Sequence, residues 1–178
     1  MQTPTKKKRK IVRKLLLLPL FGSMLTFYLV FENLNTYSIY YEEQLATSEK
    51  ERRDNVIKVT ITNLRSLHHK DIPKMYFFTG GLNLIRNFNS SYTPHYPSIE
   101  KTTNGYSYLS NDENRYYFDN KLNLRYGTTP PDYKLLDISQ VNEEEIKDKI
   151  YETIKPVIDA QKKPKLFNLL WLYKLLRK

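Results

Sequence analysis

A charge-free apolar segment that directly follows a cluster of basic residues constrains this chain more than any other feature. Residues 15–31 read Leu-Leu-Leu-Leu-Pro-Leu-Phe-Gly-Ser-Met-Leu-Thr-Phe-Tyr-Leu-Val-Phe. As a helix that rises about 1.5 Å per residue, they would cover about 25 Å, at the short end of what crosses a bilayer. We therefore predict a transmembrane anchor here. Its apolar side chains are Leu15, Leu16, Leu17, Leu18, Leu20, Phe21, Leu25, Phe27, Leu29, Val30 and Phe31.

The basic residues before this segment predict its orientation. Positive charge on one flank keeps that flank in the cytoplasm, so residues from Glu32 onward are expected outside. No small-residue cleavage site of the Ala-x-Ala kind follows the apolar segment, which favours an uncleaved, single-pass signal-anchor. A cleaved signal peptide and a buried helix of a soluble protein are the alternatives. The topology charges are Lys6, Lys7, Lys8, Arg9, Lys10, Arg13 and Lys14.

The formal charge of +10 by itself suggests a nucleic-acid-binding protein. The distribution of this charge along the chain argues against that interpretation. Residues 1–14 hold seven basic side chains and residues 162–178 hold six, with no acidic residue in either range. The 16 basic residues between them are outnumbered by all 19 acidic ones, so nucleic acid is not an expected partner. The chain has no cysteine, which excludes disulfides and thiolate metal sites and favours a bacterial cell envelope.

The patterning predicts an α+β protein with one transmembrane helix, a helical stalk, and a small antiparallel sheet packed by C-terminal helices. The expected divisions are a cytoplasmic basic tail (1–14), the transmembrane helix (15–31), a membrane-proximal and largely helical stalk (32–71), a β-rich extracytoplasmic domain (72–138), and C-terminal helices (139–178). Within the stalk, residues 56–62 remain open between helix and strand. Their β-branched residues at alternating positions favour a strand, whereas Ile57 and Ile61 have helical spacing.

Strands are predicted over residues 74–78 and 106–110, with a loop over 89–105 that ends in a turn at Asn104-Gly105. A hairpin is predicted from residues 115–118 and 122–126, with Leu122, Leu124 and Tyr126 on one face. Asn142 is the predicted N-cap of a helix that Pro156 kinks or interrupts. The apolar stripe of that helix is Ile146, Ile150, Ile154 and Ile158.

The segment 165–178 is basic and apolar but too short to span a bilayer. We interpret it as a helix at the membrane interface, with the aromatic side chains at headgroup depth and the cations on anionic lipid. The alternative is a terminal helix docked on its own domain or on a partner chain. The residues of the interfacial helix are Leu169, Leu170, Trp171, Tyr173, Lys174 and Arg177.

Tyrosines gather around the predicted hairpin and form a candidate binding face, on which tyrosine rings stack on sugars or anchor a protein partner. Strand alternation predicts that about half of them belong to the core instead. The candidates are Tyr106, Tyr108, Tyr116, Tyr117 and Tyr126.

No catalytic, metal or cofactor site is predicted. His68, His69, Asp71 and His95 lack metal-ligand spacing. The leading hypothesis is a non-enzymatic interaction or assembly module of the cell envelope, whose partners are the lipid bilayer and another envelope protein. The alternative is a membrane-bound hydrolase of an envelope polymer, for which Asp112, Glu113 and Asp119 are the candidate carboxylates. The sequence does not indicate a small-molecule ligand or an oligomeric state.

Overall fold

The chain divides into two compact units in a computed structural model. The structure describes residues 6–63, 72, 75–78, 83–86, 97–161 and 163–177, with the backbone alone for 6–18, 76–78 and 83–86. One unit, the helical unit, comprises Met1–Tyr37 with Pro164–Lys178, and the other, the sheet domain, comprises Ser38–Lys163. The divisions between these two units fall near residues 37 and 163.

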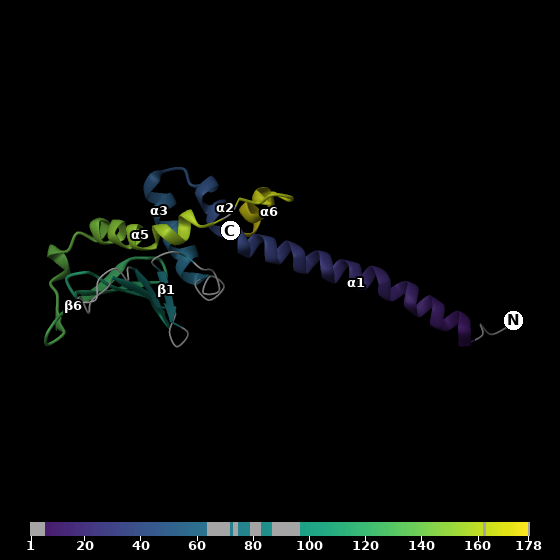
Figure 1. Ribbon diagram of the computed structural model, residues 1–178, viewed down its shortest axis with the longest axis horizontal. Coiled ribbons are helices and arrows are strands. Elements are labelled where there is room, and N and C mark those ends of the chain that lie inside the picture. The colour runs from purple at the N-terminus through teal and green to yellow at the C-terminus, as the bar shows by residue number, and fades with distance from the viewer. Residues whose placement is uncertain are drawn as a thin grey trace. The chain divides into compact units, whose positions relative to one another are not determined.

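The sheet domain is built on a seven-stranded antiparallel meander, in which each strand pairs with the next in the chain (Figure 1). The α+β class with an antiparallel sheet is confirmed. Three strands, β2, β3 and β7, were not predicted, and β3 lies inside the expected 89–105 loop. The strands are β1 (Met75–Phe78), β2 (Asn83–Arg86), β3 (Ser98–Thr102), β4 (Gly105–Leu109), β5 (Arg115–Asp119), β6 (Leu124–Thr129) and β7 (Lys134–Leu135).

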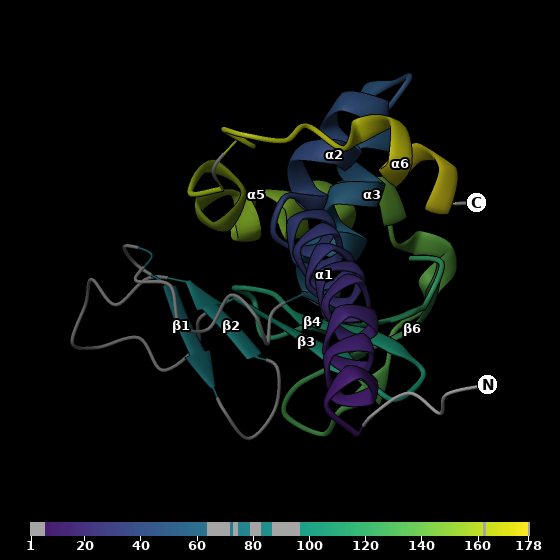
Figure 2. The same ribbon diagram turned by 90° about the vertical axis from the view of Figure 1, so that its right-hand side faces the viewer.

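Two helices of this domain, α3 (Glu49–Thr62) and α5 (Glu143–Asp159), lie over one face of the sheet (Figure 1, Figure 2). The helices of the domain are α2 (Ser38–Leu45), α3 (Glu49–Thr62), the 3₁₀ turn η1 (Ile138–Gln140) and α5 (Glu143–Asp159). Apolar side chains of α3, α5 and the sheet form one core. Its buried members are Ile39, Val56, Ile57, Ile61, Ile72, Met75, Ile99, Tyr106, Tyr108, Tyr116, Phe118, Leu122, Ile146, Ile150, Ile154, Val157 and Ile158.

The structure decides that residues 56–62 are helical. The α3 N-terminus is capped by Ser48, whose hydroxyl accepts a hydrogen bond from the Glu51 amide at 3.1 Å. Glu51 in turn accepts from the Thr47 amide, so both sides of the helix start are satisfied. Ile57 and Ile61 then pack fully buried in the core. Capping and burial outweigh the strand preference of the β-branched residues.

The helix α5 follows its sequence pattern closely. Asn142 is the N-cap and accepts from the Glu145 amide at 3.3 Å, as predicted. All four isoleucines of the predicted stripe are buried in the core. The predicted interruption is not seen, because the helix continues past Pro156 to Asp159.

The predicted hairpin is confirmed as β5 and β6, but its faces differ from the prediction. Leu122 lies in the turn with a φ of 68° and is fully buried. A bulge then shifts the register, so that Phe118 pairs with Leu124 whereas Tyr117 pairs with Tyr126. Leu124 consequently packs against the core and Tyr126 turns to the opposite face.

The helical unit contains α1 (Lys6–Thr36) and α6 (Leu170–Leu176). Its two chain segments are joined by a hydrogen bond from Asn33 Nδ2 to the Phe167 carbonyl at 3.1 Å. Among the residues that the structure describes, no helix is both long enough and apolar enough to cross a membrane. Of the predicted anchor, the side chains of residues 15–18 lie outside the described part, and so do those of the topology charges at residues 6–14.

Candidate functional site

The apolar side chains of α1 point outward over the described residues 19–31. Phe27 is 77% exposed, and seven other apolar or aromatic side chains in this segment are at least 56% exposed. Because they occupy consecutive and alternating positions, they surround the helix rather than forming one stripe. A helix that is apolar on all sides belongs in a protein core or in a membrane. The exposed side chains are Leu20, Phe21, Met24, Leu25, Phe27, Tyr28, Leu29 and Phe31.

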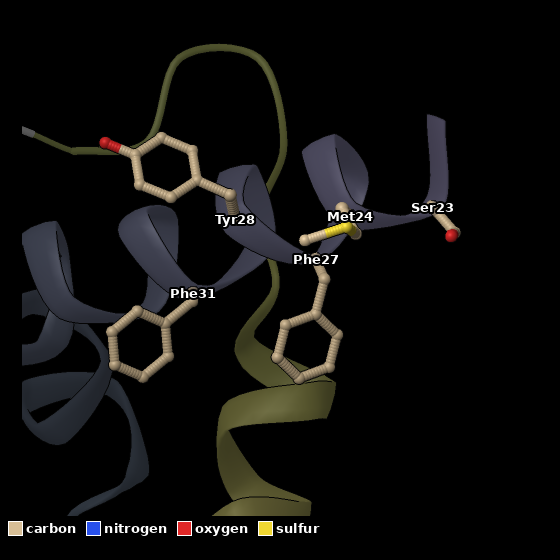
Figure 3. Close-up of a pocket in the computed structure, with 5 residues that line it drawn as sticks. All are labelled: Ser23, Met24, Phe27, Tyr28 and Phe31. Carbon is tan, nitrogen blue, oxygen red and sulfur yellow. The ribbon is translucent and has the colours of Figure 1, made fainter. Parts of the chain in front are cut away.

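A shallow apolar hollow of about 580 Å³ runs along the same part of α1. In Figure 3 the ring of Tyr28 points to the opposite side of the helix from the rings of Phe27 and Phe31. The only polar side-chain atoms along the hollow are hydroxyl groups, of which Ser23 donates to the Leu20 carbonyl at 2.8 Å. This surface suits contact with acyl chains, because its backbone groups and the Ser23 hydroxyl already have partners within the helix.

The predicted interfacial helix corresponds to α6 and belongs to the same compact unit as α1. It begins where the Asn168 side chain accepts from the Leu170 amide at 3.0 Å. Leu169, Leu170 and Tyr173 are partly covered, whereas Trp171 is 67% exposed. Lys174 and Arg177 are also exposed. The helix therefore has a packed side and an open side, and the open side includes its tryptophan.

The sheet domain has its own concentration of exposed apolar residues. Its large exposed apolar side chains, within the described part, are Tyr126, Tyr133, Leu135 and Ile138, all in one stretch of 13 residues around β6 and β7. Thr128 pairs with Leu135, and residues two apart on a strand share a face, so Tyr126 and Leu135 lie on the same side. We call these four residues and Tyr117 the aromatic patch.

Two of the residues in the aromatic patch are stacked tyrosines. The rings of Tyr117 and Tyr126 lie 4.3 Å apart with an interplanar angle of 17°. They come from paired positions of β5 and β6, and they face away from the core because Phe118, the next residue of β5, points into it. Rigid stacked aromatic surfaces are suited to anchoring a partner, since little side-chain entropy is lost on binding.

Three of the five candidate tyrosines are not available for binding. Tyr106, Tyr108 and Tyr116 are each no more than 6% exposed and belong to the core. The Tyr108 hydroxyl shares a hydrogen bond with Thr153 of α5 at 3.4 Å, and burial raises the pKa of Tyr108. The binding-face prediction is therefore reduced to Tyr117 and Tyr126, in line with the expectation that about half of the set is core.

The carboxylates proposed for the hydrolase alternative are not gathered in one place. Asp112 precedes β5 and Asp119 ends it, so the length of the strand, about 3.3 Å per residue, separates them. Asp112 accepts from the Ser110 hydroxyl and from Asn114, and the Ser110 hydrogen bond is the main cause of its lowered pKa. Glu113 lies in the same turn with a φ of 64°.

Asp119 is saturated with donors. It accepts from the Asn123 and Lys121 amides, from the Asn123 side chain and from Arg125 at 2.6 Å. The hydrogen bonds from Asn123 are the largest cause of a pKa lowered to about 2. A general acid needs a pKa near the working pH, so this arrangement suits a turn-stabilising carboxylate rather than an acid catalyst.

A cluster of charged residues between α3 and α5 was not predicted from the sequence. The Arg53 guanidinium donates to Glu144 and Asp148 of α5 at 2.7 Å each, and to Asp54 at 2.8 Å. Although burial opposes it, the pKa of Arg53 is raised by these three hydrogen bonds. Lys147, which is nearly buried, pairs with Glu143 at 2.6 Å. The sequence shows only the spacing of charged residues within each helix. The ion pairs between the helices form only when α3 and α5 pack together.

This cluster borders a small polar groove of about 350 Å³ on the sheet domain. Because the carboxylates of Glu144 and Asp148 are already bonded to Arg53, the cluster acts as a clamp between two helices and not as an open ligand site. No group of His, Asp and Glu that suits a metal ion occurs within the described residues. His68, His69, Asp71 and His95 lie outside the described part of the chain.

No family model, no curated protein and no solved structure matches this chain. Inference about its function therefore rests on the exposed surface of α1 and on the aromatic patch of the sheet domain.

Proposed function

We propose that this chain is a single-pass, membrane-anchored protein whose sheet domain is a non-enzymatic interaction or assembly module of the cell envelope. In this proposal residues 15–31 of α1 form the anchor, the basic head stays in the cytoplasm, and the sheet domain lies outside. The observation that carries the proposal is the exposure of apolar side chains on all sides of α1. Exposing such a surface to water costs a free energy of about 25 cal/mol per Å² of apolar area, whereas contact with hydrocarbon does not carry this cost.

The aromatic patch supports the interaction role. A water-exposed sheet face normally carries polar side chains, yet here Tyr126 and Leu135 are exposed on the same side of the sheet. Tyr133 is exposed in the turn that connects their two strands. Clustered tyrosine and leucine side chains of this kind act as anchors in protein interfaces. We therefore propose that the partner is another envelope protein that covers the aromatic patch.

Topology is the first test, and a chain without cysteine makes it straightforward. Asn120→Cys places a thiol on the exposed β5–β6 turn, and Thr5→Cys places one in the basic head. Intact cells, with any outer membrane made permeable, are treated with a membrane-impermeant maleimide. The proposal expects labelling of the Asn120→Cys protein without lysis and of the Thr5→Cys protein only after lysis. The reverse result, or recovery of the protein outside the membrane fraction, would overturn it.

The partner role is tested by site-specific photo-crosslinking in intact cells. A photoreactive phenylalanine analogue replaces Tyr133 in the aromatic patch or, as a matched control, Lys155 on the exposed side of α5. The proposal expects a discrete adduct from position 133, lost when Tyr126→Ala is added, and none from position 155. Equal adducts from both positions, or none from 133, would contradict a specific partner on this surface.

A further inference from the structure

We propose that the segment of residues 164–177 lies on the outer surface of the same bilayer that α1 crosses and binds anionic phospholipid headgroups there. The sheet domain would then be held to the membrane at both of its connections. This inference rests on the proposed function, because it requires α1 to be in the membrane.

The position of the segment is set by Asn33. Its Nδ2 donates to the Phe167 carbonyl at 3.1 Å, which brings residue 167 beside the end of the apolar part of α1. Asn33 follows Phe31, the last apolar residue of the proposed anchor, by two residues or about 3 Å along the helix. The Phe167 carbonyl is therefore fixed at the depth where α1 leaves the hydrocarbon, which is the headgroup region.

The packing of α6 leaves an open side of the right composition. Trp171 and Leu175 are four residues apart, so they share a helix face, and they are 67% and 60% exposed. Leu170 and Tyr173 are partly covered within the helical unit. Tryptophan at the border between water and hydrocarbon is favoured because its ring is apolar and its N–H is polar. A helix lying in the interface would present this open side to lipid.

The positive charge of the segment indicates that the lipid it binds is anionic. Residues 160–178 contain six basic side chains and no acidic one, and Lys163, Lys165 and Lys174 are exposed. Every cation near an anionic membrane surface strengthens binding about fivefold. A protein partner for a surface with this charge would need a matching acidic apolar groove, whereas an anionic bilayer offers both features to any segment held at its surface. The observations therefore favour lipid.

The chain contains a single tryptophan, so its fluorescence reports on α6 alone. The full-length protein is reconstituted into vesicles of phosphatidylcholine with or without phosphatidylglycerol. Part of the phosphatidylcholine is brominated near the top of its acyl chains. The proposal expects Trp171 emission to be blue-shifted and quenched by the brominated lipid, more strongly with phosphatidylglycerol present. Lys165→Gln with Lys174→Gln should lower the ratio of docked to undocked segment about fivefold per charge removed.

The matched control moves the tryptophan to the sheet domain. In the Trp171→Phe, Tyr133→Trp protein the reporter stands on an exposed position of the aromatic patch. Its emission should stay at long wavelength and should not be quenched by brominated lipid. Equal quenching at both positions would overturn the proposal, because it would show that no particular segment is selected.

The remaining outcomes separate this inference from the proposed function. Alkaline extraction of the same vesicles tests whether α1 is integrated. If the protein stays with the vesicles but Trp171 is water-exposed and quenched by iodide, the further inference fails and the anchor stands. If Trp171 is blue-shifted but insensitive to brominated lipid, α6 is docked on protein and the inference also fails. If the protein is extracted, the proposed function itself fails.

Discussion

Side chains of the same kind are buried in one unit of this molecule and exposed in the other. Phe118 of the sheet domain is 3% exposed, whereas Phe27 of the helical unit is 77% exposed. Tyr108 and Tyr28 differ in the same way. The sheet domain gathers its apolar residues because water is its solvent, and it needs several elements to do so. In α1 the apolar residues surround one helix, which indicates that its surroundings must supply the apolar contacts.

The largest expected effect comes from removing a core side chain of the sheet domain. Ile150→Ala should lower the free energy of unfolding by about 3 kcal/mol, because Ile150 is fully buried and its truncation leaves a cavity. Urea unfolding followed by circular dichroism in detergent micelles measures it. Leu25→Ala in α1 removes a similar side chain and should leave the unfolding of the sheet domain unchanged. Equal losses in the two variants would abolish the contrast between the units.

A charge in α1 tests the same contrast from the other side. Leu25→Lys should make the free energy of membrane integration less favourable by about 3 kcal/mol, the cost of a lysine near the centre of a membrane helix. The measurement is the fraction of protein that resists alkaline extraction from membranes. Leu135→Lys, at an exposed position of the sheet domain, is the control and should leave that fraction unchanged. An unaltered fraction in the Leu25→Lys protein would argue against hydrocarbon around α1.

The next largest effect is expected from the ion pairs that join α3 and α5. Arg53→Met is expected to destabilise the sheet domain by about 2 kcal/mol, because Asp54, Glu144 and Asp148 lose a largely buried cation. Arg125→Met breaks the exposed pair with Asp119 and should cost under about 1 kcal/mol. Urea unfolding of both variants decides the matter. If both cost the same, then burial of Arg53 adds nothing to its ion pairs.

The smallest effect is a change in acid sensitivity. The Arg53 hydrogen bond is the main reason why the pKa of Glu144 is lowered from 4.5 to about 2. A carboxyl whose pKa is lower in the folded state stabilises the fold above pH 4.5, and this contribution is lost as the pH falls toward 2. Glu144→Gln should therefore flatten the stability profile between these values. Unfolding free energies across this range measure the effect, and an unchanged slope would contradict it.

The sequence was most informative where one local signal and one periodic signal agreed. In α5, the Asn142 cap and the isoleucine stripe indicated the same helix, and burial of the stripe followed. In residues 56–62 two periodic signals conflicted. The Ser48-x-x-Glu51 capping pattern was present in the sequence and would have favoured the helix, because it marks a helix start just upstream.

Other features depend on contacts that no local pattern contains. The strand β3 was hidden because Ser98–Thr102 has little apolar alternation, and its place in the sheet comes from pairing with β4. Arg53 has partners about 90 residues away in the chain, so the clamp needs the tertiary structure. The aromatic patch could be predicted only in part from the sequence. Alternation predicted that some tyrosines are core, but the position of Tyr126 depends on a register shift.

That register shift has a consequence for how the protein varies. Arg125 is the extra residue that separates the two sides of β6, since Leu124 faces the core and Tyr126 faces away. Substitutions at Tyr126 therefore change the outer surface without touching the packed interior. The outer face of this hairpin can therefore change independently of Leu122, Leu124 and Phe118, which pack in the core.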